Sequence, residues 1–491
     1  MRRISFARLT TSSLLPAVLF AAVAAFAARR PRYGGTLFID FEGRATSLDP
    51  TQPPAAIEDK VAQDRILELI SNRLVTLDEF GQAQPSLAIS WTHDAAFKHW
   101  ELVLRDVKLQ DGTLAGEQTV VDSLQAANPT WHVSSASEMR PAVAGGVRAP
   151  TVIIDFDAPQ PDLLYRLAEA RNSILIHEAD GSFAGTGPFR ITTWEPGKHA
   201  VLTANADYWG GRPFVDAIDI QMGRTIRDRM IDLDLGKADI VDVAPDRARI
   251  DASRGVRVSA SAPSELLALV FLRSSAAAKD IRVRQALSLA IDRASLVDFV
   301  LQKEGEPAGG LVPQWCSGYA FLFSPPPAAS AQAAQLAAQI SPAAALKLGY
   351  DSADAMERTV ADRIVVNAQA AGIPISAHPI GDSTAGGAAL SDAVILRLPL
   401  SSPDPAVALE DFLQTLAPLA DLDSSLAAPL ADPASLDELY SRERAVLDTY
   451  EIIPLAHVPE VVGLSARVRD WMPAHSGAWG LADVWLDGAQ P

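Results

Sequence analysis

The segment formed by residues 355–375 constrains the fold of this chain most, because it predicts a helix that runs directly into a strand. Residues 355–371 have the periodicity of an amphipathic helix, and Gly372 then supplies a stop signal. Ile373 and Ile375 begin a strand immediately afterwards. Because a helix, a glycine and a strand in this order are typical of an α/β layer, we expect helices packed on a sheet.

Other segments extend this α/β prediction. Apolar residues alternate along 97–104, and again along 189–194 and 199–203 around a Glu-Pro-Gly-Lys turn, which predicts a strand and a hairpin. Residues 281–302 show helical periodicity with charges on the opposite side. By contrast, residues 324–342 are rich in Ala, Pro, Ser and Gln, so we expect a surface excursion there.

The length of the chain and its N-terminal segment limit the class of protein to which it can belong. A chain of 491 residues is longer than a single hydrophobic core usually supports, so we expect roughly three domains, or two with a discontinuous connection. Residues 1–28 read as an export signal, with basic Arg2, Arg3 and Arg8, an uncharged run, and a small-x-small site at residues 25–27. The alternative is a retained N-terminal membrane helix, because the uncharged run is nearly long enough to span a bilayer. Either way, we expect a periplasmic protein.

Charge and cysteine content exclude several function classes. The formal charge of −18 repels phosphate backbones, so we expect no nucleic-acid partner. Cys316 is the only cysteine, which rules out a disulfide or a multi-cysteine metal site within one chain. We expect no cofactor and no metal.

The sequence also lacks the common catalytic signatures, such as G-x-S-x-G, S-x-x-K, H-E-x-x-H and the phosphate-binding loop, so we expect no enzyme. His93 and His99 are six residues apart and lack a third ligand, so surface or packing roles are favoured over a metal. Arg224, Arg227 and Arg229 lie beside three aspartates, which predicts a solvated helix face with mixed ion pairs; the aspartates are Asp228, Asp232 and Asp234.

Several short motifs stand out along the chain: Tyr33-Gly34-Gly35-Thr36-Leu37, Ser47-Leu48-Asp49-Pro50, Gly185-Thr186-Gly187-Pro188-Phe189-Arg190, Asp207-Tyr208-Trp209-Gly210-Gly211-Arg212-Pro213, and Val283-Arg284-Gln285-Ala286-Leu287. Their order is that found in the peptide and nickel class of periplasmic solute-binding proteins, family 5, which this chain resembles over residues 33–487.

The resemblance implies an α/β, two-lobed periplasmic binding-protein fold of type II character, with an inserted domain and a cleft that closes by hinge motion. On the family pattern, residues 33–74, 185–270 and 465–491 form lobe I, 75–184 the inserted domain and 271–464 lobe II. It further implies a monomer that captures a peptide or similar small solute and delivers it to an ABC permease in the inner membrane.

One departure from the family pattern concerns the ligand. Peptide binders of this family usually hold the ligand's amino terminus with an aspartate, and Ser401 stands at that position here. A hydroxyl lacks the opposite charge, and charge-assisted hydrogen bonds are about twice as strong, so a free peptide amine is less securely implied.

Four other residues are candidates for ligand contact, each with a structural alternative. Asp404 is the nearest acid to Ser401 but is also a typical turn residue between two prolines. Arg397 lies in a strand-like run and could face a ligand carboxylate or reach solvent. Trp315 and Tyr319 could stack on a ligand or pack beneath a loop.

Two functions from other classes remain open at this stage. Ser401 and the shortness of the inserted domain between Leu124 and Thr151 also fit a binding fold repurposed as an envelope sensor or protein-partner module. A secreted hydrolase has no supporting feature beyond the export signal.

Overall fold

A computed structural model describes residues 31–52, 54, 57–78, 81–136, 149–177, 183–276, 279–340, 345–381, 390–426, 428, 430, 435–471, 473 and 479–488. The proposed export signal lies outside the described residues, and so do residues 137–148 of the segment between Leu124 and Thr151. Within the described part, no helix combines the length and apolarity needed to cross a membrane.

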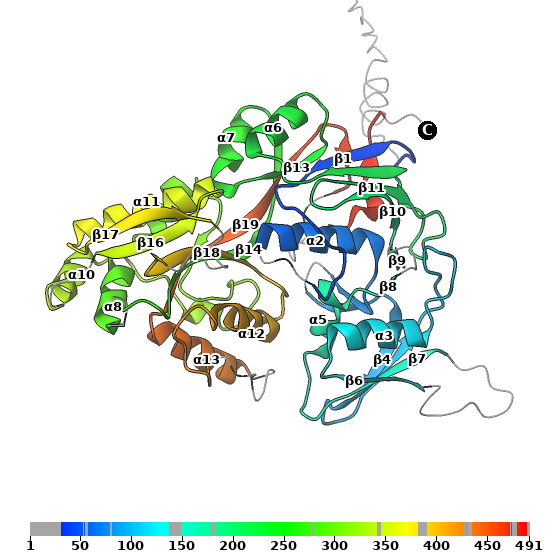
Figure 1. The fold of residues 1–491 in the computed structure, drawn as a ribbon, viewed down its shortest axis with the longest axis horizontal. Coiled ribbons are helices and arrows are strands. Elements are labelled where there is room, and N and C mark those ends of the chain that lie inside the picture. Colours follow the sequence, from blue (N-terminus) through cyan, green and yellow to red (C-terminus); the bar gives the residue numbers. More distant parts are fainter. Residues whose placement is uncertain are drawn as a thin grey trace, which may run out of the picture.

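One mixed sheet runs through most of the molecule and, within the described residues, contains eleven strands (Figure 1). Its order is β10 (Phe189–Glu195), β11 (His199–Ala204), β12 (Ala217–Gln221), β1 (Thr36–Asp40), β13 (Ile240–Val243), β19 (Ile452–Leu464), β14 (Arg257–Phe271), β18 (Ala393–Pro399), β16 (Leu346–Asp351) and β17 (Ile375–Ile380), with β15 (Glu306–Pro307) paired to β19. The hairpin predicted around residues 195–198 is confirmed as β10 and β11.

The long strands β14 and β19 join two halves of this sheet (Figure 1). In the β1 half, α2 (Ile57–Ile70) packs with β1 and β10–β12, while α6 (Ile226–Asp234), η2 (Pro245–Arg247) and α7 (Ala248–Ser253) lie near the opposite face of β13. The short elements β20 (Val468–Arg469), η6 (Leu481–Asp483) and β21 (Trp485–Leu486) return to this half from the chain's end.

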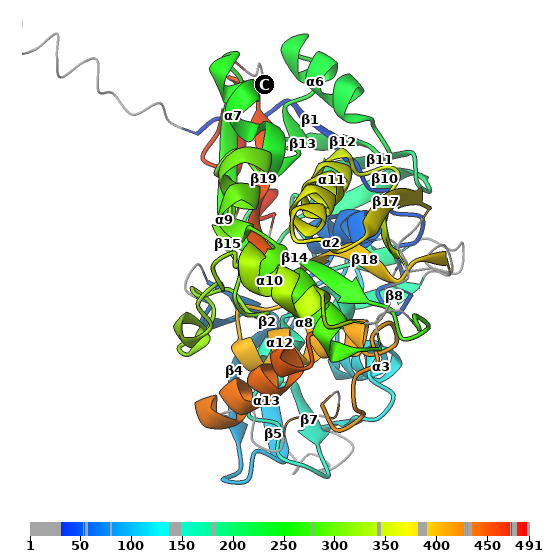
Figure 2. The same cartoon turned by 90° about the vertical axis from the view of Figure 1, so that its left-hand side faces the viewer.

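In the β18 half, helices cover both faces of β14 and β18 (Figure 2). Leu267 and Leu269 face one core, with α8 (Ile281–Ala290), α10 (Ser330–Ala337) and α11 (Ala355–Ala370). Leu266 and Ala268 face the other core, with α12 (Pro405–Leu416) and α13 (Leu436–Asp448). The alternation of strand side chains thus builds two cores from one strand.

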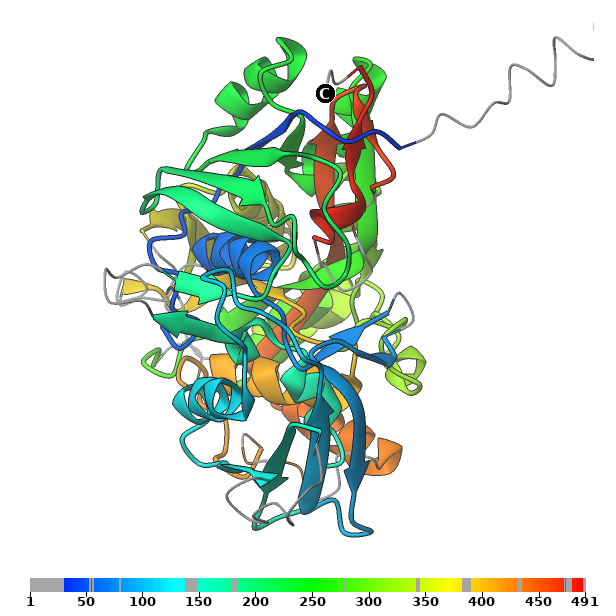
Figure 3. The same ribbon diagram turned by 90° about the vertical axis from the view of Figure 1, so that its right-hand side faces the viewer.

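A smaller four-stranded sheet has a core of its own below α2 (Figure 3). Its order is β4 (Ala88–His93), β5 (His99–Leu104), β7 (Thr151–Asp155) and β6 (His132–Ser135), and α3 (Glu117–Ala127), α5 (Leu163–Leu167) and η1 (Ala170–Asn172) pack nearby. Two short pairs, β2 (Val75–Leu77) with β3 (Ala83–Pro85) and β8 (Leu175–His177) with β9 (Phe183–Gly185), flank it. We call residues 74–174 the insert.

The helix predicted over 355–371 is confirmed as α11, and Gly372 follows it with a positive φ of 74°. Two other expectations differ from the structure. The helix expected over 281–302 stops at Ala290, and Asp292 caps a second segment made of α9 (Arg293–Ser295) and the π-helical η3 (Leu296–Val300). The segment expected to be a surface excursion contains α10, whose Ala333 is fully buried.

Candidate ligand-binding site

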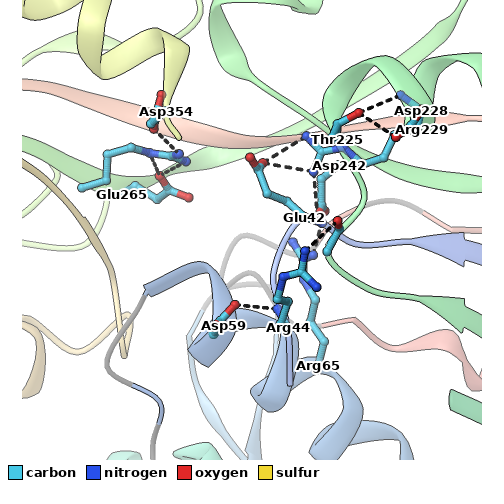
Figure 4. Close-up of polar contacts among 12 residues, drawn as sticks. Glu42, Arg44, Asp59, Arg65, Thr225, Asp228, Arg229, Asp242, Glu265 and Asp354 are labelled. Atoms are coloured by element: carbon cyan, nitrogen blue, oxygen red, sulfur yellow. Dashed lines mark hydrogen bonds and ion pairs between the residues drawn. The ribbon is translucent and has the colours of Figure 1, made fainter. Parts of the chain in front are cut away.

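Charged side chains gather where the two halves of the large sheet meet (Figure 4). Four neighbouring strands each contribute one of them, and α2, α6, α11 and the residues after β1 add the rest. We call this set the junction network; it consists of Glu42, Arg65, Arg229, Asp242, Glu265, Asp354, Arg397 and Glu460.

Arg65 of α2 links the strands β13 and β19. Its Nη1 donates to Asp242 Oδ1 at 2.7 Å, and its Nη2 donates to Glu460. Its guanidinium carbon also lies 4.2 Å from the centre of the Trp479 ring, a cation–π geometry. Because Arg65 is only 6% exposed, its charge depends on these partners rather than on water.

Arg229 of α6 completes the network on the β1 side. Both of its terminal nitrogens donate to Glu42 Oε2 at 3.0 Å, and Asp242 lies 3.9 Å away. Burial alone would raise the pKa of Asp242, but the charges of Arg65 and Arg229 outweigh it and hold that pKa below its usual range. Asp242 is therefore ionised and shared by two guanidinium groups.

Arg397 of β18 forms the other end of the network. Its Nε and Nη2 donate to Glu265 Oε2 at 2.9 and 2.6 Å, and its Nη1 donates to Asp354 Oδ2 at 3.1 Å. Asp354 also caps α11 by accepting from the backbone N–H groups of Met356 and Glu357. The arginine charge is thus already matched by two carboxylates of the protein.

Further carboxyl groups surround Arg397, and burial raises the pKa of each. The pKa of Glu357 rises to about 8, first through burial and then through Asp354. Burial likewise raises the pKa of Glu58 at the start of α2 and of Asp246 in η2. Acidic side chains therefore outnumber basic ones among the residues named at this junction.

The loop after β1 packs closely against the backbone at the start of α2. A Cβ on Gly43 would lie 1.9 Å from the carbonyl oxygen of Glu58, so only glycine fits there. The next residue, Arg44, donates its backbone N–H to Asp59 Oδ1 at 2.6 Å (Figure 4). This close approach fixes the position of Glu42 beside Arg229.

The structure brings three of the five sequence-predicted ligand residues to one stretch of β14. Arg397 pairs with Leu267 in the strand register, and Trp315 Nε1 donates to the carbonyl of Pro263 at 2.7 Å. Ser401 is exposed and directly follows Leu400, whose N–H donates to the carbonyl of Ser264 at 2.7 Å. These three residues can therefore line one region next to the junction network.

The other two predicted residues have structural partners. Asp404 caps α12, accepting from the N–H groups of Ala406 and Val407 at 3.0 and 3.1 Å. Tyr319 is 3% exposed and lies in the core between β14 and α12, where burial and the nearby Glu443 raise the pKa of its hydroxyl. Both residues therefore have structural contacts of their own.

The histidines serve separate local contacts. His93 stacks on Phe97 with ring centres 4.4 Å apart, and His99 bonds Asp155 Oδ1 at 2.7 Å. Among the residues that the structure describes, no three potential ligands are grouped to hold a metal ion.

Sequence reasoning missed the part of the network built on Arg65 and Arg229. The expectation of a solvated face holds for exposed Arg227 but is wrong for Arg229, which is 1% exposed. The sequence does not separate the two arginines, because Arg227 also has an apolar residue four positions later, the exposed Ile231. The partners Glu42 and Asp242 are distant in sequence, so no local pattern indicates them.

Comparisons with known proteins agree with this architecture. Residues 82–416 match the family model described as bacterial extracellular solute-binding proteins, family 5 middle. The chain is 26% identical over 249 residues to the probable D,D-dipeptide-binding periplasmic protein DdpA of Escherichia coli strain K12, a match covering 48% of each chain. The alignment with this curated relative thus spans about half of its length.

Solved structures match over nearly the whole chain. The ABC transporter substrate-binding protein CtaP of Listeria monocytogenes superposes with a TM-score of 0.77 at 16% identity, covering 93% of this chain and all of CtaP. NikA of Brucella suis, solved with Fe(III)-EDTA, gives 0.77 at 20% identity, covering 92% of this chain and all of NikA. The chain has the two-lobed periplasmic binding-protein fold and belongs to family 5 of the bacterial extracellular solute-binding proteins, a family of solute-binding proteins.

Proposed function

We propose that this chain is the substrate-binding component of an ABC importer and captures a peptide or similarly sized solute between the β1 half and the β18 half. The observation that carries the proposal is membership of a solute-binding family over residues 82–416. The names of relatives support the solute class, because DdpA is described as binding dipeptides and NikA was solved with a metal chelate. The protein would act without catalysis, as a periplasmic monomer that docks on a permease and does not bind nucleic acid.

The domain boundaries and the ligand contacts form the second part of the proposal. Residues 33–74, 185–270 and 465–491 would make lobe I, 75–184 the inserted domain and 271–464 lobe II. The separate cores of the β1 half, the insert and the β18 half support three such units, with residues 266–270 of β14 packing in the cores of the β18 half. Ser401 and Trp315 would touch the solute directly, whereas Arg397, Asp404 and Tyr319 would shape the surface around it.

Native mass spectrometry of the mature protein purified from its host's envelope tests this function. We expect a bound small molecule that disappears on denaturation, and thermal stabilisation when that molecule is added back, because ligands of the native state raise stability by mass action. A protein that carries no solute and is stabilised by no peptide, sugar or metal chelate would refute the proposal. Deleting the gene should abolish uptake of the identified solute.

A further inference from the structure

A second contact between the two halves lies away from the junction network, between the insert and α12 (Figure 1). Arg166 of α5 donates from Nη2 to Glu410 of α12. Its Nε also donates to Asp162 Oδ2 at 2.7 Å. The side chains of Arg166, Glu410 and Asp162 are only 12%, 9% and 4% exposed, so water screens this ion pair little.

The insert is attached rigidly to the β1 half. Gln110 Nε2 donates to the carbonyls of Ile70 and Phe189 at 3.0 and 2.6 Å. The backbone N–H of Gln110 also donates to the carbonyl of Gly185 at 2.9 Å. The insert therefore moves with the β1 half.

α12 belongs to the β18 half. Its Phe412 and Leu413 are buried in the core shared with β14 and α13. Glu410 Oε1 accepts from the N–H of Leu430 at 2.8 Å, which keeps the carboxylate in place on this side. The bond between Arg166 and Glu410 thus joins two bodies that a hinge motion would separate.

Glu169 lies just after α5, and its side chain is only 10% exposed. Glu169 Oε2 accepts from Arg171 of η1 at 2.8 Å, and its other oxygen is buried without a hydrogen-bond partner among the described residues. The charges that face it are Asp411 of α12, Arg171, Arg166 and Lys60 of α2. Lys60 is itself paired with Asp64 at 2.6 Å, which reduces its effect on Glu169.

These surroundings favour the protonated form of Glu169 when the contact is closed. Burial and then Asp411 raise its pKa to about 7, from an ordinary value of 4.5. Separation of α12 removes the charge of Asp411, so the pKa falls. A group whose pKa is higher in the closed form takes up a proton on closing, and closure is therefore disfavoured as the pH rises towards and beyond 7.

We propose that the contact of α5 and Glu169 with α12 is a proton-linked latch, which forms when the two halves close and holds them closed through Arg166 and Glu410. The latch rests on the proposed function, in which closure encloses the solute. It acts without touching the solute, so Arg166, Glu169 and Glu410 are positioning residues for capture.

Pulsed electron paramagnetic resonance on the full chain, dialysed free of solute, measures the separation of the halves. Nitroxide labels would be attached at Asp157→Cys in the insert and Leu436→Cys in α13, both exposed positions, in a Cys316→Ser background. We expect the closed fraction to fall about threefold or more between pH 6 and pH 8. Arg166→Met should lower the closed-to-open ratio about tenfold or more at pH 8, because it leaves Glu410 and Asp162 without a cation.

Three variants complete the design. Glu169→Gln should remove the dependence of the closed fraction on pH. Its closed fraction should stay at the value that the parent has at pH 6. Glu410→Gln retains the acceptor for Leu430 and serves as the test of the ion pair where Arg166→Met fails to fold. Arg444→Met removes an exposed ion pair with Asp448 within α13 and should behave like the parent.

Unchanged distance distributions in Arg166→Met and Glu410→Gln would overturn the role of the ion pair, and a parental pH response in Glu169→Gln would overturn the proton link. Because these distances are measured without solute, the result is independent of whether the protein binds one. Absence of solute binding in mass spectrometry would instead contradict the proposed function and leave the latch measurement standing.

Discussion

At the scale of single residues, buried charges in this protein are tied to partners from distant parts of the chain. Arg65 joins strands β13 and β19, and its partner Glu460 lies 395 residues away in sequence. Replacing every member of such a network with apolar residues changes the free energy of unfolding little. Removing one member, however, leaves the other charges buried and unpaired. The junction network should therefore be sensitive to single substitutions.

Replacing Arg65 with methionine should lower the free energy of unfolding by about 3–5 kcal/mol, because Asp242 and Glu460 lose their shared cation. Urea denaturation measures this change. Lys60→Met on the same helix is the matched control, since the Lys60–Asp64 pair is 44% and 32% exposed and should contribute less than about 0.5 kcal/mol. Equal effects of the two substitutions would contradict the role assigned to Arg65.

We expect Glu443 of α13 to make the free energy of unfolding depend on pH. It is fully buried and accepts from the N–H groups of Leu311 and Val312 at 2.5 and 3.3 Å, yet burial raises its pKa to about 7. The folded protein thus holds a proton that the unfolded chain releases above about pH 4.5, and its contribution to stability is lost as the pH rises through 7.

Glu443→Gln keeps an acceptor for both N–H groups and carries no charge. It should raise the free energy of unfolding by about 1–3 kcal/mol at pH 8 and leave it nearly unchanged near pH 4.5. Urea titrations at the two pH values measure the difference. A gain of equal size at both would show that Glu443 does not titrate in this window.

At the scale of elements, the start of α12 decides between two roles for Asp404, which are capping the helix and contacting a ligand. Its first turn carries Pro405 at a position where the missing N–H costs nothing, and Asp404 accepts the next two N–H groups. The capping geometry satisfies one oxygen of Asp404, which favours a structural role for this acid over direct ligand contact.

Asp404→Ala should therefore lower the free energy of unfolding by about 1 kcal/mol, whereas Asp404→Asn should cost only a few tenths. Solute affinity, measured by calorimetry on the co-purified molecule, should change less than about threefold in Asp404→Asn. A loss of affinity without a loss of stability would instead place Asp404 on the ligand.

At the scale of the whole molecule, β14 and β19 are the continuous connections through the large sheet, and they are not regular. Pro263 pairs with Pro459, and the register shifts between Ala260 and Pro263 and again before Glu265. Prolines donate no backbone hydrogen bond, so the ladder is weakest there. This position, between the two halves, is where we expect the strands to bend.

Hydrogen exchange followed by mass spectrometry tests this hinge. Amides of residues 259–262 should exchange about tenfold faster or more than those of residues 266–270, which are fully buried and lie between β18 and β19. Uniform protection along β14 would argue against bending at the proline pair.

Local sequence patterns determined much of the fold. The hairpin at residues 189–204 and helix α11 were predictable because their periodicity and turn residues lie within one short window. Predictions over longer stretches of sequence were less reliable. The helix expected over 281–302 stops at Ala290 because Asp292 caps a new segment. Helix α10 forms in an Ala-rich stretch because Ala333 packs in the core with α8.

The order of short motifs along the chain also determined the family, which the match over residues 82–416 confirms. Only the tertiary structure decided which charges are buried and which face each other. Arg229 has the same local pattern as exposed Arg227, and Arg166 meets Glu410 across 244 positions of sequence. Coulomb interactions and burial depend on distance in space, and a sequence records only distance along the chain.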